Sequence, residues 1–310
     1  MIKPPPDFRK SLKPGKVFIT WDITYKCNYK CSYCHYGGAK DSCEPCETVY
    51  PGTDKWVEIW TDIYERYGSC QIHIVGGEPF YYPDFMNLIV KLSKIHTWEC
   101  STNLSWAPET LIANISPGRA RIGVSYHPEF VGFEEFYAKA VKLKKAGFEV
   151  WANYVAYPSI LEGMDECKRR FEEAGISMSI LPFKGQYKGK TYPEAFTEEE
   201  RAFLRKLGTE PWVQKTLDFT FDKKQQQTRN KKCRMGQMYA KISANGDALS
   251  CCTGNAVKLG NVIQGTFALL DEPVTCNDDK CPCWKCMLVD NEEHWCAHWV
   301  VPPDGRINTK

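Results

Sequence analysis

Residues 17–34 read VFITWDITYKCNYKCSYC, and this stretch decides the fold. The run from Val17 to Ile23 is rich in β-branched and aromatic side chains, which predicts a strand. Directly after it, Cys27, Cys31 and Cys34 follow one another in a C-x3-C-x2-C pattern, in a loop rich in tyrosine. We therefore expect a strand that presents three thiols at its carboxyl end, where α/β barrels carry their active sites.

The same strand-then-helix order repeats downstream. Apolar residues at i, i+3, i+4 and i+7 mark helices that pack on a sheet, and short β-rich runs separate them. The expected strands cover 17–23, 71–75, 98–103, 121–126, 148–156 and 176–182, and the expected helices lie around 56–63, 85–92, 133–141 and 160–174. About six βα units imply parallel strands and fit a partial (β/α)6 barrel better than a closed eight-stranded one.

The last third of the chain has a different pattern. Thr197 and Glu200 form a capping box for a helix over 197–207, and polar residues 222–232 indicate a linker or exposed loop. Two β-rich runs, 239–242 and 248–250, flank Asn245-Gly246, a hairpin signal. The predicted divisions are an N-terminal extension (1–16), the barrel (17–210), a linker (211–232) and a small cysteine-rich domain (233–310), whose eight cysteines favour stabilisation by metal.

Composition excludes several classes of function. A net charge of +2 gives no broad attraction to nucleic acid or to anionic membranes. No run approaches the roughly 20 apolar residues of a membrane span, and residues 1–16 lack the apolar core of a secretory signal. We therefore expect a soluble protein of the reducing cytoplasm, in which 16 cysteines serve as metal ligands more readily than as disulfides.

The three clustered cysteines suit an iron–sulfur cluster. Thiolates from one short loop can bind three corners of a [4Fe-4S] cubane and leave the fourth iron open to another ligand. The alternative is a structural zinc site, which needs a fourth protein ligand, and His35 is available for it.

At this point the sequence resembles the radical S-adenosylmethionine (SAM) superfamily. The resemblance rests on the cysteine motif, with Tyr33 before its last cysteine, and on Gly76-Gly77-Glu78-Pro79 at the end of the second predicted strand. It implies that the open iron chelates the amino and carboxylate groups of SAM and that the Gly-Gly-Glu segment binds the methionine amino group. Reductive cleavage of SAM then yields a 5′-deoxyadenosyl radical that abstracts a hydrogen atom from substrate.

The resemblance extends, more weakly, to three further strand ends. Ser101 and Asn103 lie at the end of the third strand, although Leu104 stands where the family usually has glycine. Ser125 and Asn153 occupy the fourth-strand and fifth-strand positions that often contact the SAM carboxylate or ribose. The alternative is that each is an ordinary polar residue at a strand end.

The C-terminal cysteines resemble a SPASM or Twitch extension, which carries auxiliary clusters in this superfamily. Cys233, Gly246 and Cys251 match its opening C-x12-G-x4-C, whereas the later spacing, C-x4-C-x-C-x2-C, departs from the SPASM pattern. A Twitch-like assignment uses Cys233, Cys251, Cys283 and Cys286 for one cluster. A compact SPASM-like assignment gives Cys233, Cys251 and Cys286 to one cluster and Cys276, Cys281, Cys283 and Cys296 to another. We favour two clusters slightly, with zinc on the last group as the alternative.

Several other residues have plainer interpretations. Cys43 and Cys46 form a second C-x2-C that suits a loop staple, a redox pair or two free thiols, and Cys70, Cys100 and Cys167 fit buried apolar positions. Cys252 alternates with Cys251 and so points away from its cluster. Tyr126 and His127 follow the fourth strand, where they either face the substrate or, for the histidine, serve the loop.

The leading expectation is a radical SAM enzyme that abstracts hydrogen from a small molecule and oxidises it through auxiliary clusters. Only 16 residues precede the first strand, which favours a small molecule over a peptide, although a peptide-modifying enzyme is the alternative. The resemblance also implies an electron donor such as flavodoxin or ferredoxin. A rival of another class is a non-catalytic iron–sulfur or zinc protein.

Overall fold

The computed structural model of the chain describes residues 17–34, 47–281 and 287–289. Its main feature is a curved sheet of nine strands in the order β13-β12-β11-β1-β2-β3-β4-β5-β6. The first six strands run parallel in chain order: β1 Phe18–Thr24, β2 Gln71–Gly76, β3 Thr97–Thr102, β4 Ala120–Tyr126, β5 Glu149–Ala156 and β6 Ser177–Pro182. This is an α/β fold with a mostly parallel sheet, as the βα repeats predict.

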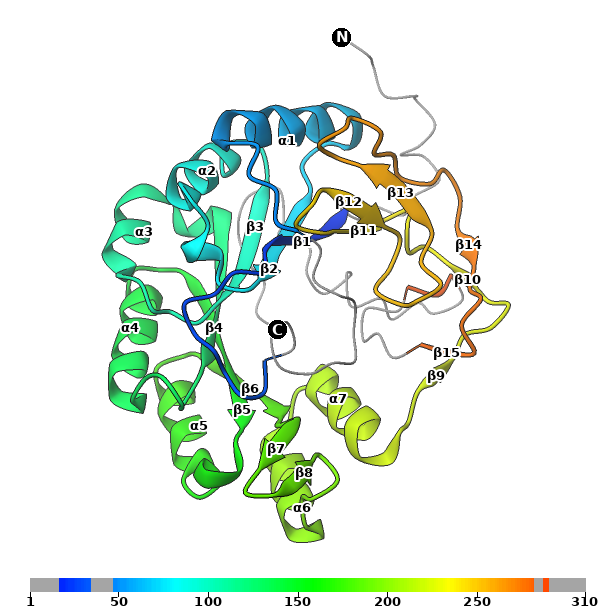
Figure 1. Cartoon of the computed structure of the whole chain (residues 1–310). Coiled ribbons are helices and arrows are strands. Elements are labelled where there is room, and N and C mark those ends of the chain that lie inside the picture. The colour runs from blue at the N-terminus through cyan, green and yellow to red at the C-terminus, as the bar shows by residue number, and fades with distance from the viewer. Residues whose placement is uncertain (1–16, 35–46, 282–286, 290–310) are drawn as a thin grey trace.

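Helices cover the convex side of this sheet (Figure 1). They are α1 Thr53–Tyr67, α2 Phe85–Leu92, α3 Pro108–Asn114, α4 Phe133–Lys145, α5 Met164–Glu173, α6 Glu198–Leu207 and α7 Pro211–Asp222, with short η1 Pro79–Tyr81, η2 Pro117–Arg119 and η3 Pro158–Ile160. In the described residues, no helix combines the length and apolar character that crossing a membrane requires.

The expected helices and strands are present in the barrel, and the capping box of α6 is formed as predicted, with Thr197 and Glu200 each accepting a backbone N–H. Several elements differ from the expectation, among them helix α3, which none of the predicted helices covers. The segment predicted as a linker begins with helix α7, whose apolar Val213 and Leu217 are fully buried. A small hairpin, β7 Gly185–Tyr187 with β8 Lys190–Tyr192, also follows β6. The polar composition of 222–232 concealed the apolar stripe directly before it.

Alternation along the strands gives the sheet two unlike faces. The convex face is apolar: Trp21 packs edge-on against Trp56 of α1, with ring centroids 4.6 Å apart, and Ile74 and Cys100 are buried beside it. The concave face is polar. The strand registers place these residues of it in lateral rows: Thr20, Asp22, His73, Glu99, Ser101, Arg121, Ser125 and Asn153. We call this set the inner face. Polar side chains that point inward in this way are typical of a binding surface or of an interior that contains water.

The C-terminal third continues the same sheet. β11 Tyr239–Ile242 pairs parallel with β1, then β12 Asp247–Leu249 and β13 Lys258–Asn261 follow antiparallel. The hairpin predicted around Asn245-Gly246 is confirmed, and Gly246 has the positive φ of 87° that its turn requires. Lys241 of β11 reaches Asp22 of β1, with Nζ 3.2 Å from Oδ2. The inner face therefore receives a charged residue from the last third of the chain.

Two short ladders hold the remaining described segments. β9 Gln226–Gln227 pairs with β15 Lys280–Cys281, and β10 Lys232–Cys233 pairs with β14 Val274–Thr275, both antiparallel. In Figure 1 these four strands lie on the right, beyond the β11–β13 edge. They bring cysteines that are well separated in the sequence to one side of the molecule.

Candidate active site

The three cysteines of the motif lie in the loop after β1, and each is half-buried. A backbone hydrogen bond from Cys34 N–H to the Cys31 carbonyl, 3.1 Å long, folds the last part of this loop into a turn. Burial first, and then repulsion from the like charges of neighbouring thiols in the motif, raise the pKa of the Cys27 thiol and raise that of Cys31 to about 12. The charge on one thiol of this loop therefore affects the pKa of its neighbours.

The two glycines of Gly76-Gly77 are required by this loop. Gly76 has a φ of 125°, and a Cβ on Gly77 would lie 2.1 Å from the carbonyl oxygen of Lys26. The close approach is used: Gly77 N–H donates to the Thr24 carbonyl at 2.6 Å and Glu78 N–H to the Lys26 carbonyl at 3.0 Å. The segment after β2 is thus hydrogen-bonded to the end of β1 and to the start of the loop that follows it, residues 25–34, which we call the cysteine loop.

Glu78 is almost completely buried and its carboxylate is fully engaged within the protein. Oε1 accepts from Phe80 N–H at 3.0 Å and from the Thr102 hydroxyl at 2.7 Å, and Oε2 accepts from Asn103 N–H at 2.6 Å. Burial raises the pKa of Glu78 to about 7, against these three hydrogen bonds, which lower it. Its side chain therefore ties the end of β2 to the end of β3, while Pro79 starts η1 behind it.

Asn103 lies beside the cysteine loop. Its Nδ2 is 2.9 Å from Asn28 Oδ1 and 3.7 Å from Cys27 Sγ, and Cys27 Sγ also accepts from Tyr29 N–H at 3.3 Å. Leu104, which stands where the family usually has glycine, adopts the left-handed φ of 56° and is buried. The turn that glycine would favour is therefore kept, and a leucine bears its strain, about 1 kcal/mol.

Ser101, Ser125 and Asn153 all belong to the inner face. Asn153 Nδ2 donates to Ser125 Oγ at 3.2 Å, which places the two predicted residues in direct contact across β4 and β5. Ser101 Oγ lies 3.2 Å from His73 Nε2. The structure thus gathers these polar side chains on the concave side of the sheet.

The loop between β4 and α4 grips the cysteine loop, and this was not foreseen. Glu129 accepts from Ser32 N–H at 2.8 Å, from the Ser32 hydroxyl at 2.6 Å and from the Tyr157 hydroxyl at 3.0 Å. His127 Nδ1 lies 2.9 Å from the Tyr33 hydroxyl and 3.4 Å from Cys31 Sγ. Burial lowers the pKa of His127 to about 4, so its ring is neutral near pH 7.

The sequence left open that Tyr126 and His127 both face a substrate, and for Tyr126 this interpretation is wrong. This side chain is buried on the convex side against Phe133, Phe136 and Tyr154. Strand alternation is the reason, since Ser125 takes the inner face. The sequence signal that could have indicated a role for Glu129 is His-Pro-Glu directly after a strand, since functional residues often lie in the loops that follow barrel strands.

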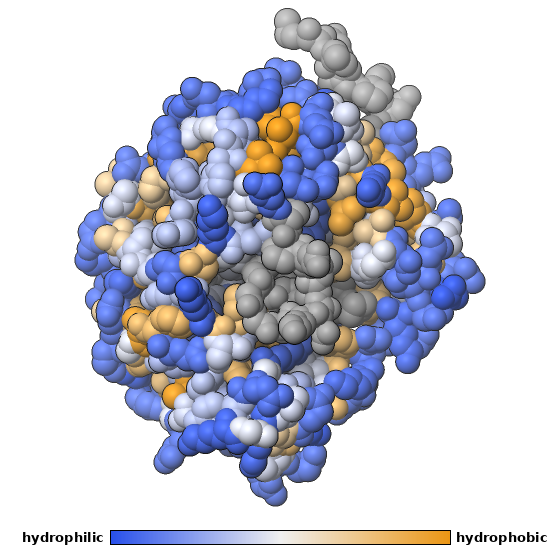
Figure 2. Space-filling model, viewed as in Figure 1, coloured by the Kyte–Doolittle hydropathy of each residue, from blue (hydrophilic) through white to orange (hydrophobic). Residues whose placement is uncertain are grey.

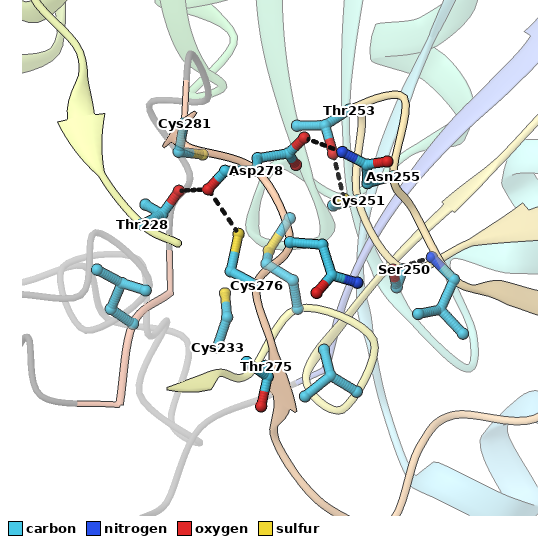
Figure 3. Close-up of a pocket in the computed structure, with 15 residues that line it drawn as sticks. Thr228, Cys233, Ser250, Cys251, Thr253, Asn255, Thr275, Cys276, Asp278 and Cys281 are labelled. Atoms are coloured by element: carbon cyan, nitrogen blue, oxygen red, sulfur yellow. Dashed lines mark hydrogen bonds between the residues drawn. The ribbon is translucent and has the colours of Figure 1, made fainter. Parts of the chain in front are cut away.

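A second group of thiols lines a cavity at the other end of the described chain (Figure 3). Cys233 on β10, Cys251 after β12, Cys276 after β14 and Cys281 on β15 all contribute to its wall. Cys251 Sγ lies 3.2 Å from Thr253 Oγ1, and burial raises the pKa of the Cys251 thiol. Tertiary structure therefore brings together cysteines that the SPASM-like assignment divides between two clusters. Cys283, Cys286 and Cys296, like Cys43 and Cys46, lie outside the described residues.

The two thiol groups are candidate ligand sets for metal. Among the described residues, no three His, Cys, Asp or Glu side chains converge on a point that would hold a single metal ion. A cubane cluster has a different requirement, because its ligands bind separate iron corners. Three half-buried thiols in one short loop, with N–H groups that donate to Cys27, fit that requirement, since hydrogen bonds to ligating sulfurs are usual around such clusters.

A parallel α/β barrel with three thiols at the carboxyl end of its first strand is the class of protein that this geometry defines. The model of the Radical SAM superfamily matches residues 21–171. This match runs from β1 to α5 and includes the cysteine loop and the Gly-Gly-Glu segment, so residues 21–171 form a Radical SAM superfamily domain. Figure 2 views the molecule from the same side and shows mostly hydrophilic residues around the rim of the barrel.

Similar proteins agree with this identification. The GTP 3′,8-cyclase of Aquifex aeolicus is 25% identical over 193 residues, which cover 56% of this chain and 58% of that protein. The chain thus spans less than two thirds of the length of this curated relative. Two solved structures share the fold: Streptococcus suis SuiB bound to S-adenosylmethionine, at 17% identity and a TM-score of 0.54 over 81% of this chain and 64% of SuiB, and anSMEcpe with bound AdoMet, at 17% identity and 0.55 over 81% and 76%.

Proposed function

We propose that the protein is a radical SAM enzyme that acts through the barrel site described above. The observation that carries the proposal is the direct bonding of the cysteine loop to the Gly-Gly-Glu segment, through Gly77 N–H and Glu78 N–H. Two motifs that are separated by helix α1 in the sequence are joined by backbone hydrogen bonds in the barrel. A non-catalytic iron–sulfur protein has no need for that second segment, whereas a SAM-binding site does.

The residues divide the work as follows. Cys27, Cys31 and Cys34 would hold a [4Fe-4S] cluster by three irons. Backbone groups around Gly76, Gly77 and Pro79 would bind the methionine end of SAM, with Tyr33, Ser101, Asn103, Ser125 and Asn153 along the remaining cofactor. When bound, the cluster and SAM would supply reductive cleavage to a 5′-deoxyadenosyl radical that takes a hydrogen atom from substrate, and auxiliary clusters would supply an electron acceptor.

Glu78 has a revised part in this proposal. Its carboxylate accepts three hydrogen bonds from its own protein, so we assign it to the shape of the site and leave recognition of the methionine amino group to nearby backbone carbonyls. The side chain holds the ends of β2 and β3 together, and through Asn103 it holds the cysteine loop. Removing it would disturb three elements at once.

For the substrate we propose a polar small molecule. The inner face carries the ion pair of Asp22 with Lys241 and the charged group of Glu99 and Arg121, with Arg121 Nη1 3.2 Å from Glu99 Oε2. Such a surface suits a ligand with its own charges or hydroxyl groups. The alternative is a peptide, because SuiB has been solved with precursor peptide SuiA and anSMEcpe with the Kp18Cys peptide. The proposal includes a cytoplasmic location and an external donor such as flavodoxin or ferredoxin.

The test is anaerobic reconstitution of the full chain with iron and sulfide, reduction with dithionite, addition of SAM and measurement of 5′-deoxyadenosine and methionine. We expect both products in equal amounts. A Cys31→Ala variant should form neither, whereas Cys167→Ala, which removes a thiol of helix α5, should form both. If the wild type binds iron but neither cleaves SAM nor changes its electron paramagnetic resonance spectrum when SAM is added, the protein is a non-catalytic iron–sulfur protein.

We also propose that the second thiol group serves auxiliary clusters. Iron would be counted in a variant that lacks all three cysteines of the barrel motif, where ~4 iron atoms per chain indicate one auxiliary cluster and ~8 indicate two. Adding Cys276→Ala distinguishes the assignments: we expect a loss of ~4 iron atoms for the SPASM-like arrangement and none for the Twitch-like one. Cys252→Ala is the matched control. Zinc in place of iron would overturn the proposal for this group.

A further inference from the structure

The loop between β4 and α4 contacts four residues of the cysteine loop: Tyr29, Cys31, Ser32 and Tyr33. Phe130 stacks on Tyr29 with centroids 4.6 Å apart and planes 9° from parallel, and Glu129 accepts both the backbone N–H and the hydroxyl of Ser32. His127 completes the series at Tyr33 and Cys31. We call His127, Glu129 and Phe130 the clamp. It touches the cysteine loop between Cys27 and Cys34, where the loop has no strand or helix of its own.

Within the clamp, His127 is the residue next to a sulfur. Its Nδ1 is 3.4 Å from Cys31 Sγ, within the range of an N–H···S hydrogen bond. Two neighbours fix the ring. Tyr33 stacks on it at 5.9 Å with planes 21° apart, and its hydroxyl oxygen, 2.9 Å from Nδ1, accepts a share of the same N–H, while Tyr29 meets the ring edge-on at 6.0 Å. A ring held from two sides cannot easily turn its Nδ1 away from the sulfur.

The position of Glu129 makes this arrangement stiff. Its Oε1 accepts from Ser32 Oγ and also from the Tyr157 hydroxyl after β5, so three loops at the carboxyl ends of the strands meet at one carboxylate. Tyr157 in turn packs on Tyr33, with centroids 5.6 Å apart. The backbone on both sides of His127 and Cys31 is thereby held in register, and the short Nδ1 to Sγ distance follows from it.

We propose that His127 is a positioning residue for Cys31: its Nδ1–H donates to the Cys31 sulfur, orients that ligand and raises the reduction potential of the cluster in the barrel. The proposal rests on the proposed function, since it needs a cluster on Cys27, Cys31 and Cys34. The physical reason is electrostatic. A hydrogen bond to a ligating sulfur stabilises the extra negative charge that reduction brings to an iron–sulfur cluster, and groups that contact ligands tune their sites in this way.

The test compares two substitutions of the same residue. His127→Leu fills similar space without a donor, whereas His127→Asn places an amide N–H near the position of Nδ1. The measured quantity is the midpoint potential of the electron paramagnetic resonance signal that responds to SAM, because only a cluster with an open iron responds. We expect a more negative potential in His127→Leu and recovery towards the wild-type value in His127→Asn. Glu134→Gln, on the exposed start of α4, is the control and should leave the potential unchanged.

The outcomes separate this inference from the proposed function. A wild type without any SAM-responsive signal contradicts the proposed function. A wild type with that signal, and a His127→Leu variant that has the same potential, overturns the inference alone. If His127→Leu does not fold, His127→Ala removes the same donor with a smaller side chain. It should also shift the potential to more negative values and keep its iron, and an unchanged potential in that variant counts against the inference.

Discussion

Gly77→Ala is expected to lower SAM cleavage by about a hundredfold or more, because a displacement of about 1 Å in a catalytic site has effects of that size. The added Cβ would lie 2.1 Å from the Lys26 carbonyl oxygen and 2.6 Å from its carbon, where ordinary contacts begin at 3.4 Å. The neighbouring atoms are backbone and cannot swing aside. The cysteine loop must therefore move away, and the hydrogen bonds from Gly77 and Glu78 to Thr24 and Lys26 must lengthen.

Gly132→Ala is the matched control for this variant. Gly132 precedes α4, has an ordinary φ of −70°, and a Cβ there meets no atom within 4 Å. Both variants would be reconstituted in parallel and compared for bound iron, for the SAM-induced spectral change and for 5′-deoxyadenosine. Wild-type rates in Gly77→Ala would mean that the cysteine loop does not depend on this contact, and the geometry that carries the proposed function would lose its support.

Glu78→Gln is expected to change how the free energy of unfolding depends on pH. Burial raises the pKa of Glu78 to about 7 from its ordinary value of 4.5, so the folded protein binds more protons than the unfolded chain between these values. The stability that Glu78 contributes is therefore fully present below about pH 4.5 and is lost as pH rises to about 7. One pKa unit corresponds to about 1.4 kcal/mol, so the loss is on the order of 3–4 kcal/mol.

The measurement is urea unfolding of wild type and Glu78→Gln at several pH values from 5 to 8. We expect the stability of wild type relative to the variant to fall as pH rises across this range. Glu134→Gln is the control: the hydrogen bond from Arg170 lowers the pKa of that exposed carboxylate, so its substitution should produce no such fall above pH 5. Parallel pH curves for wild type and Glu78→Gln would show that Glu78 is not the group that titrates.

Glu78→Gln should also lower stability at pH 8, by about 1–3 kcal/mol, the cost of leaving a buried donor unsatisfied. The amide has a single acceptor oxygen, whereas the carboxylate accepts from Phe80, Thr102 and Asn103. Its NH2 group would face an N–H donor at one of these positions. The size of this loss reports how tightly the ends of β2 and β3 are joined.

Much of the barrel could be predicted from the sequence because the signals for its helices and strands are local. The apolar periods of α1, α2 and α4 and the β-branched runs of β1 and β5 each lie within one short, continuous stretch of chain, and the capping box of α6 spans a single helical turn. Helix α7 was not predicted because its apolar stripe stands directly before a polar run, and that run led to the prediction of a linker for the whole segment. The cysteine motif and Gly76-Gly77 were equally visible, since each is a short pattern tied to the end of a strand.

Other features depend on residues that are far apart in the sequence. The pairing of β11 with β1 joins Lys241 to Asp22, and no local pattern announces that a strand from the last third of the chain returns to the first one. The same holds for the clamp, where Glu129 meets Ser32. The role of Glu78 also changed for this reason: a motif places the residue, but its three hydrogen-bond donors come from η1, from the end of β3 and from the residue after β3.

The sequence by itself determined the βα order, the motif of three cysteines and the Gly-Gly-Glu segment, because strand and helix periods and motif spacings act over short distances. Tertiary structure decided which groups meet. It turned Tyr126 into the core, directed His127 to Cys31, and gathered Cys233, Cys251, Cys276 and Cys281 around one cavity. The physical reason is that such contacts depend on the register of distant strands and on the packing of their loops, which are set only when the whole sheet forms.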